Sequence, residues 1–368
     1  RLSQRHRTDP ALRRSQGHSH QRDRAMTQPA APAPHWHGAG SVPAMMRQVL
    51  YALLPAAAAH VFFYGPGLLV NALVATLAAL ATEALALRWR GQPQRLFLSD
   101  GSAVVTAVLL AFCLPPLTPW WVTVTGAVFA VGVAKHLYGG LGLNIFNPAM
   151  AGFALLLLCF PAEMTAWPPP RIGDLDYRTL SIGQTLFYVF SGRLPDGLVL
   201  DAVTRATPLE LAKTGLAQMH TMSEIRSNPV FGDFGGAGWE WVGNFVTLGG
   251  GWLLYRGIIR WQIPAATLAG ILLPALLFWL ADPETHPSPL FQLWTGGTLL
   301  AAFFIATDPV SSPVTSRGQV IYGLGCGLLT FVIRAWGSFP DGVAFAVLLM
   351  NAAVPVIDRY TRPHIYGR

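Results

Sequence analysis

Charged residues are scarce in this sequence, and their scarcity argues against a soluble fold. Only 12% of the 368 residues are Asp, Glu, Lys or Arg, while 52% are hydrophobic. A soluble domain usually carries roughly 25% charged residues, so this chain has too little charge to cover a water-facing surface. Much of the net charge of +7 lies in the first 25 residues and at chain ends, and membrane topology favours basic residues beside spans. We therefore expect an integral membrane protein that contacts a lipid bilayer and binds no nucleic acid.

Cysteines are few, and the motifs of common cofactor sites are absent. Cys113, Cys159 and Cys326 lie in or beside apolar runs without CxxC spacing, so neither zinc nor an iron–sulfur cluster is indicated. We expect all three to be small buried side chains. The sequence contains no Walker A motif, no dinucleotide fingerprint and no spaced haem ligands. If this chain carries electrons, a flavin or a quinone has to carry them.

Long apolar runs dominate the chain from about residue 46 onward. About ten of them are long enough, or nearly so, to cross a bilayer, which takes about 20 residues. They cover about 46–64, 67–88, 101–116, 118–136, 145–162, 239–256, 263–281, 290–306, 319–336 and 341–357. Basic residues lie at the ends of the second, fourth and sixth runs, at Arg88, Lys135 and Arg256. This bias predicts cytoplasmic termini and a non-cytoplasmic loop at 163–238.

The fold class that follows is an all-α polytopic membrane protein with broken helices. We expect a disordered basic extension (1–40), a first membrane half (41–162), the outer loop (163–238), a second half (239–358) and a cytoplasmic tail (359–368). Short runs bounded by Gly and Pro occur at comparable places in both halves, which favours two five-helix halves of inverted polarity. Coincidence among Gly- and Pro-rich membrane helices explains the similarity equally well.

The outer loop contains the most informative segment, Asp201-Ala-Val-Thr204-Arg205-Ala-Thr207-Pro-Leu-Glu210. Thr207 has the position of an N-cap, proline takes the first helical position, and Glu210 follows three residues after the cap, as in a capping box. The free N–H groups of a first helical turn also attract phosphate. The segment therefore predicts a helix start, and a helix start is compatible with a phosphate site.

A second polar segment, residues 135–150, combines glycines and a proline with Asn144 and Asn147 at the border of an apolar run. Unwound backbone at membrane depth is tolerated where it is buried or lines a cavity. The two amides could hydrogen-bond the edge of a planar heterocycle, with Phe146 or Tyr138 packed on its face. They could equally cap neighbouring helix ends in a re-entrant turn.

Two titratable residues lie near the ends of apolar runs. Asp100 precedes a short run, and an acid near membrane depth is a candidate functional residue, although an N-cap at the interface explains it better. His60 lies near the outer end of the first run. We expect His60 to be a satisfied interfacial residue rather than a ligand.

Several of these motifs together resemble a known family. They are Asp100-Gly-Ser-Ala-Val-Val-Thr106, Leu114-Pro-Pro, Tyr138-Gly-Gly-Leu-Gly-Leu-Asn144-Ile-Phe-Asn147-Pro-Ala-Met, and Asp201 to Pro208. In this order and spacing they resemble the D subunit of the Rnf ion-translocating electron-transport complex, which is related to the B subunit of the sodium-pumping NADH:quinone oxidoreductase. The resemblance covers about residues 42–360.

The resemblance implies a flavoprotein of the bacterial inner membrane with its loop 163–238 in the periplasm. It implies FMN bound to Thr207 through a phosphoester, attached by a separate flavin transferase, within the motif that includes Asp201 and Thr204. It also implies a non-covalent riboflavin, for which Asn144, Phe146, Asn147 and Asp100 are the candidate residues. No metal site and no residue that performs bond chemistry itself are expected.

The implied activity is that of one component of an ion-translocating ferredoxin:NAD oxidoreductase, in which electron transfer drives Na⁺ or H⁺ movement. The implied partners are the A, B, C, E and G subunits of the Rnf complex, especially the FMN-bearing G subunit. One residue departs from the family pattern: Arg205 stands where a small residue is usual. Arg205 either slows the transferase, changes the geometry of the loop, or pairs with the flavin phosphate. A small-solute channel and a non-redox scaffold are the alternative functions.

Overall fold

The computed structural model describes residues 41–172, 180–194 and 198–362, and within them not the side chains of Leu96, Leu200 and Asp201. The predicted disordered extension 1–40 lies outside the described residues, as does most of the predicted tail 359–368.

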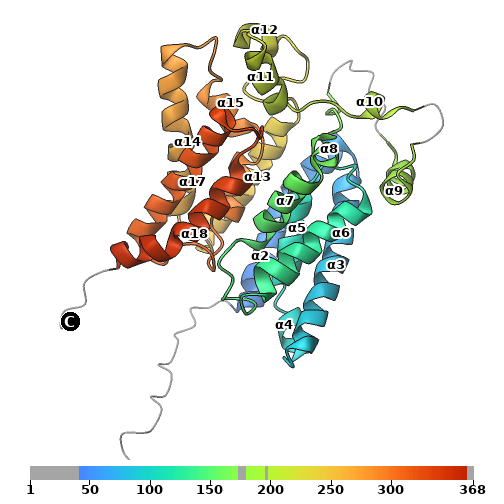
Figure 1. The fold of residues 1–368 in the computed structure, drawn as a ribbon, viewed down its shortest axis with the longest axis vertical. Coiled ribbons are helices and arrows are strands. Elements are labelled where there is room, and N and C mark those ends of the chain that lie inside the picture. Colours follow the sequence, from blue (N-terminus) through green and yellow to red (C-terminus); the bar gives the residue numbers. More distant parts are fainter. Residues whose placement is uncertain (1–40, 173–179, 195–197, 363–368) are drawn as a thin grey trace, which may run out of the picture. The chain divides into compact units, whose positions relative to one another are not determined.

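The first part of the described chain forms helices that lie side by side in the blue to green half of Figure 1. They are α2 (Val42–Tyr64), α3 (Gly67–Trp89), α4 (Gln94–Leu98), α5 (Ser102–Cys113), α6 (Trp120–Val128), the π-helix η1 (Phe129–His136), α7 (Pro148–Cys159) and α8 (Pro161–Thr165). α6 continues directly into η1, so the predicted run 118–136 is a single helical rod with two geometries.

The rest of the chain contains short helices followed by longer ones. The short helices are α9 (Ile182–Ser191), α10 (Leu200–Val203), α11 (Pro208–Ala217) and α12 (Met222–Arg226). The later helices are α13 (Trp239–Tyr255), α14 (Gln262–Ala281), α15 (Pro289–Trp294), α16 (Thr298–Leu300), the π-helix η2 (Ala301–Ile305), α17 (Ser316–Trp336) and α18 (Val343–Thr361). In Figure 1, α11 and α12 lie above α13 and α15.

The architecture is helical throughout the described ranges, where the only β-type pairings are two isolated bridges. Five of the described helices (α2, α3, α14, α17 and α18) are long and apolar enough to cross a membrane. α5 and α7 are apolar but have only 12 residues each. These helices confirm a polytopic membrane protein, and they confirm that some of the predicted runs are short or broken. The run 290–306 is interrupted between α15 and α16.

Close contacts between helix backbones hold the later helices together. A methyl group added to Gly270 on α14 would collide with the carbonyl of Leu324 on α17, and one added to Gly327 on α17 would collide with the carbonyl of Thr267. Small residues allow such approaches, which supply van der Waals packing where the lipid gives no hydrophobic driving force. The cysteines follow the expectation only in part: Cys326 is buried, but Cys159 is exposed on the described chain.

Candidate functional site

Thr207 begins α11 as the sequence predicts. Its Oγ1 accepts a hydrogen bond of 3.2 Å from the backbone N–H of Glu210, and Pro208 takes the first helical position. Burial raises the pKa of the Glu210 carboxyl, although the backbone N–H of Thr207 opposes this shift. The cap uses a lone pair of the Thr207 hydroxyl oxygen and not the O–H proton. That proton can therefore be replaced by another group while the cap is kept.

Two contacts fix the segment that carries Thr207. On one side, the backbone N–H of Arg205 donates to the carbonyl of Trp167 at 2.7 Å. On the other, the Lys213 ammonium donates to the carbonyls of Gly337 (2.5 Å) and Phe339 (2.8 Å) in the connection from α17 to α18. Partial burial lowers the pKa of Lys213. These contacts hold the start of α11 between the connection that follows α8 and the connection from α17 to α18.

A cavity opens beside Thr207 at this end of the bundle. It has about 180 Å³ of free space, whereas a single water needs about 10–15 Å³, so it has room for a group much larger than one water. Most of its wall is apolar, with polar groups at a few points, as is typical of small-molecule sites. Its lining includes His60, Phe112, Met150, Trp167, Thr207, Glu210, Trp239, Trp294, Phe339 and Asp341.

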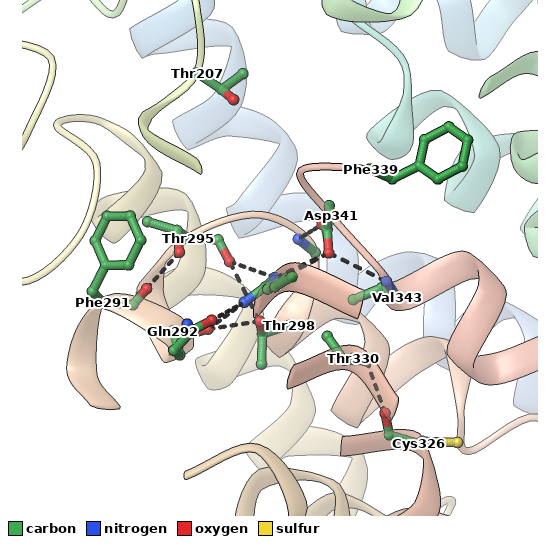
Figure 2. A network of polar contacts seen from close by, with 12 residues as sticks. Thr207, Phe291, Gln292, Thr295, Thr298, Cys326, Thr330, Phe339, Asp341 and Val343 are labelled. Carbon is green, nitrogen blue, oxygen red and sulfur yellow. Dashed lines mark hydrogen bonds and ion pairs between the residues drawn. The ribbon is translucent and has the colours of Figure 1, made fainter. Parts of the chain in front are cut away.

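A polar network closes one wall of this cavity, and Figure 2 shows it beneath Thr207. The Arg334 guanidinium contacts Asp341 Oδ1 at 3.0 Å and also donates to the carbonyls of Gln292 (2.8 Å) and Thr295 (3.2 Å). Asp341 Oδ2 accepts a 2.7 Å hydrogen bond from the backbone N–H of Gly297. Arg334 therefore links the break between α15 and α16 to the start of α18, and both segments line the cavity.

The other residues of the predicted attachment motif lie close to the cavity in the chain but are not named in its wall. Thr204 is partly buried and Arg205 is exposed, and each makes a further interaction. Asp201 belongs to α10, but its side chain lies outside the described part of the structure. The structure thus brings Thr207 and Glu210 to the cavity and leaves the roles of Asp201, Thr204 and Arg205 as predictions.

The amides of the second polar segment are engaged in local structure. Asn147 caps α7, accepting from the N–H of Met150 at 3.1 Å, and its Nδ2 donates to the carbonyl of Ile305 at 3.2 Å. Asn144 is buried and donates to the carbonyl of Phe146 at 3.1 Å. The Phe146 and Tyr138 rings pack edge to face, with centroids 6.3 Å apart. The helix-capping interpretation therefore holds for Asn147, which still retains part of its hydrogen-bonding capacity.

Because Gly101 holds the N-cap position of α5 without a side-chain cap hydrogen bond, the favoured N-cap interpretation was wrong for Asp100. Its Oδ1 accepts from the backbone N–H of Ser102 (2.7 Å) and from the Ser102 hydroxyl (2.5 Å) at the start of α5. The Ser102 hydroxyl in turn accepts a 2.7 Å hydrogen bond from the Lys135 ammonium. Asp100 thus belongs to a larger buried polar cluster.

The core of that cluster is a pair that was not predicted from the sequence. Glu83 on α3 and Lys135 on η1 form a buried ion pair, and His136 Nε2 lies 3.4 Å from the same carboxylate oxygen. Each side chain of the pair is only 2% exposed. Glu83 lies inside an apolar run and Lys135 was assigned to a cytoplasmic loop, so only their distance in space reveals the pair. A basic residue at the end of the fourth run and an acid inside the second run are the available signals.

The structure also corrects the expectation for His60. Instead of a satisfied interfacial residue, it is a 1%-exposed side chain that lines the cavity. Neither of its ring nitrogens has a hydrogen-bond partner among the described residues. No local pattern in the sequence indicates this environment, because the surrounding rings come from distant segments.

Comparison with known proteins agrees with the resemblance drawn from the motifs. The profile of the NQR2, RnfD, RnfE family matches residues 30–367. Proteins named as the D subunit of an ion-translocating oxidoreductase complex are similar over almost their whole length. That of Aliivibrio salmonicida is 46% identical over 342 residues (91% of this chain and 97% of the relative).

Two further relatives with the same name give closely similar figures. The protein of Vibrio cholerae is 48% identical over 344 residues (92% of this chain and 98% of the relative). The protein of Pseudomonas aeruginosa is 48% identical over 346 residues (93% of this chain and 96% of the relative). Since both kinds of match cover nearly all of the chain, it belongs to the NQR2, RnfD, RnfE family.

Proposed function

We propose that this chain is the membrane-embedded D subunit of an ion-translocating oxidoreductase complex. The similarity to proteins of that name over nearly their whole length supports this assignment. In this function the chain passes electrons between partner centres, linked to ferredoxin and NAD, while the complex moves Na⁺ or H⁺. Its partners are the A, B, C, E and G subunits, with the G subunit as the neighbour in the electron path.

The cofactor in this proposal is FMN, attached to Thr207 through a phosphoester by a flavin transferase. The observation that carries it is the position of Thr207 on the wall of a cavity larger than any single water requires. Thr207 is partly exposed, so its hydroxyl can be reached. A phosphate on Thr207 Oγ would lie at the N-terminus of α11, where the helix dipole favours negative charge.

The residues of the cavity have separate roles in this function. Bound flavin supplies the electron-carrying chemistry, while the protein supplies binding, orientation and electrostatics. Trp167, Trp239 and Phe112 form apolar surfaces that suit a planar ring and exclude water. Arg334 and Asp341 fix the polar part of the wall, and Lys213 holds α11 to the connection from α17 to α18.

The topology of this function follows the distribution of basic residues. We place both termini in the cytoplasm, the loop 163–238 with Thr207 in the periplasm, and the ten runs in two inverted five-helix halves of an inner-membrane protein. The exposed basic residues Arg88 and Arg256, at the ends of the second and sixth runs, support this orientation, whereas Lys135 is buried against Glu83.

We further propose that a non-covalent riboflavin binds near the segment 137–147, with Asn144, Phe146, Asn147 and Asp100 as candidate residues. Gly139 and Gly140 both have positive φ values, 129° and 97°, which side chains rarely adopt, so the backbone leaves helical geometry here. The remaining donor and acceptor positions of the two amides are the groups available to a heterocycle edge.

Mass spectrometry of the purified, denatured chain tests the FMN assignment. The peptide that contains Thr207 should carry an added mass of FMN less one water, and the denatured band should fluoresce in a gel. Thr207→Ala should insert normally and lose both signals. No adduct on the unaltered chain, in a host that has the transferase, would favour a small-solute channel or a scaffold.

The neighbouring helix supplies a matched control. The Thr221 hydroxyl caps α12 by accepting from the N–H of Glu224, as the Thr207 hydroxyl does from Glu210, and Glu224 adds a capping box. Thr221→Ala removes a threonine cap, which costs about 1 kcal/mol, but should keep the adduct. Loss of flavin in both variants would show that loop stability, rather than attachment at Thr207, controls the signal.

A further inference from the structure

His60 is a buried polar side chain whose partner is absent from the described protein. It lies on α2, is 1% exposed, and lines the cavity that Thr207 also lines. Its Nδ1 and Nε2 have no hydrogen-bond partner among the described residues. A buried donor or acceptor without a partner costs about 1–3 kcal/mol. A ligand bound in the cavity of the functional protein would supply the missing hydrogen bond to His60.

Aromatic rings surround the imidazole. The ring centroid of His60 lies 5.2 Å from that of Tyr64, 6.1 Å from Phe112 and 6.5 Å from Trp167. The Trp239 ring is 6.3 Å away at an interplanar angle of 82°. The Tyr64 hydroxyl does not serve His60, because it donates to the carbonyl of Ala237 at 3.1 Å.

The two acids of the cavity are engaged elsewhere. The Asp341 carboxylate accepts from Arg334 and from the backbone N–H groups of Gly297 and Val343. The Glu210 carboxylate is served by the backbone N–H of Thr207 and makes no hydrogen bond with either ring nitrogen of His60. Neither acid therefore serves His60, and its two ring nitrogens are left to meet a ligand.

Water alone is a poor occupant for this place. A buried water needs two to four polar partners, and the wall around His60 is made of aromatic rings. A planar heterocycle suits the same surroundings, because aromatic rings pack on its faces while a neutral imidazole offers one donor and one acceptor to its edge. An isoalloxazine ring has carbonyl and N–H groups along one edge and apolar faces on both sides.

We infer that His60 hydrogen-bonds the isoalloxazine ring of the flavin carried on Thr207 and so orients it and tunes its reduction potential. This inference rests on the proposed function, since it takes the flavin on Thr207 as the ligand. The shared cavity joins the two residues, which lie on α2 and at the start of α11. Thr207 tethers the phosphate end, and His60 fixes the ring end.

A redox titration of the full-length chain with its covalent flavin tests the inference. We expect His60→Leu to keep the adduct mass on the Thr207 peptide and to shift the midpoint potential by about 30 mV or more. That shift equals a tenfold change in the relative binding of oxidised and reduced flavin for a two-electron couple. His60→Gln, which keeps a donor and an acceptor, should restore most of the potential. The Thr207→Ala chain provides the baseline from any non-covalent flavin.

The outcomes are distinct. An unchanged potential and an unchanged visible spectrum in His60→Leu, with the adduct present, would overturn the role of His60 and leave the proposed function standing. An unaltered chain without the adduct would overturn both. Val242→Ala is the matched control, since it changes the wall of the same cavity at an apolar residue with no proposed role in flavin binding. An equal shift in that variant would assign the effect to packing and so overturn the hydrogen bond. If His60→Leu fails to accumulate, His60→Phe, which also offers no hydrogen bond to the flavin edge, takes its place and is judged by the same two outcomes.

Discussion

The backbone N–H of Asn147 donates a 2.9 Å hydrogen bond to Oδ1 of Asn351, a residue 204 positions later in the chain. Asn351 is fully buried on α18, and its Nδ2 donates to the carbonyl of Ser311 (3.0 Å) and to the Tyr322 hydroxyl (2.8 Å). A single amide thus joins the start of α7 to three segments of the later chain. We call these hydrogen bonds of Asn351 the Asn351 network. It gives the N–H of Asn147 and the carbonyl of Ser311 a hydrogen-bond partner inside the apolar core.

Removing this amide should destabilise the protein. Asn351→Leu leaves the N–H of Asn147 and the carbonyl of Ser311 without this partner, and each such loss costs about 1–3 kcal/mol. We expect a lower midpoint in thermal or detergent-induced unfolding. Thr247→Val is the control, because the exposed Thr247 hydroxyl donates only to the carbonyl of Gly243. Equal unfolding midpoints for the two variants would contradict a stabilising role for the hydrogen bonds of Asn351.

The buried pair of Glu83 and Lys135 predicts a non-additive effect. Lys135→Met leaves the Glu83 carboxylate buried without its cation, which typically costs about 3–5 kcal/mol. The double variant Glu83→Leu/Lys135→Met should unfold closer to the unaltered chain than Lys135→Met does. Additive losses in this double-mutant cycle would show that the two side chains do not interact.

An exposed pair gives the control for that cycle. His220 and Glu224 approach within 3.5 Å, but their side chains are 57% and 62% exposed. Solvent screens such pairs, so Glu224→Gln should leave the unfolding midpoint unchanged.

The Arg334 network should respond to geometry as well as to charge. Arg334→Leu leaves Asp341 unpaired, whereas Arg334→Lys keeps a charge but cannot reproduce the planar fork that reaches Gln292, Thr295 and Asp341. We expect faster proteolysis near α11 and less covalent flavin in both variants. Arg317→Leu, at an exposed residue near the start of α17, is the control. Full rescue by lysine would show that charge alone suffices.

The start of α11 should depend on pH through Glu210. Burial raises its pKa above that of the unfolded chain, so the folded state binds the proton more tightly than the unfolded state. Stability from this group is therefore present below the unfolded pKa and falls as pH rises through the folded pKa. Hydrogen exchange of α11 should become faster over this range, and Glu210→Gln should abolish that part of the pH dependence. The same pH dependence in Glu210→Gln would assign the effect to another group.

The sequence by itself determined the membrane class, the helix start at Thr207 and the family. The membrane class follows from scarce charge and long apolar runs, and the helix start follows from the spacing of Thr207, Pro208 and Glu210. These features depend only on composition and on residues close together in the sequence. The Asn147 cap was likewise a local possibility, because the side chain bonds a backbone group only three residues away.

Only the tertiary structure decided what surrounds His60 and which charges pair in the core. The cavity wall combines residues from His60 to Val343, and the pair of Glu83 and Lys135 joins side chains 52 positions apart. Such groupings depend on how helices pack, and packing is fixed by contacts that no local pattern records. The physical reason is the same in both cases. A buried polar side chain needs a hydrogen-bond or charge partner in place of water, and the whole fold decides which side chains are buried.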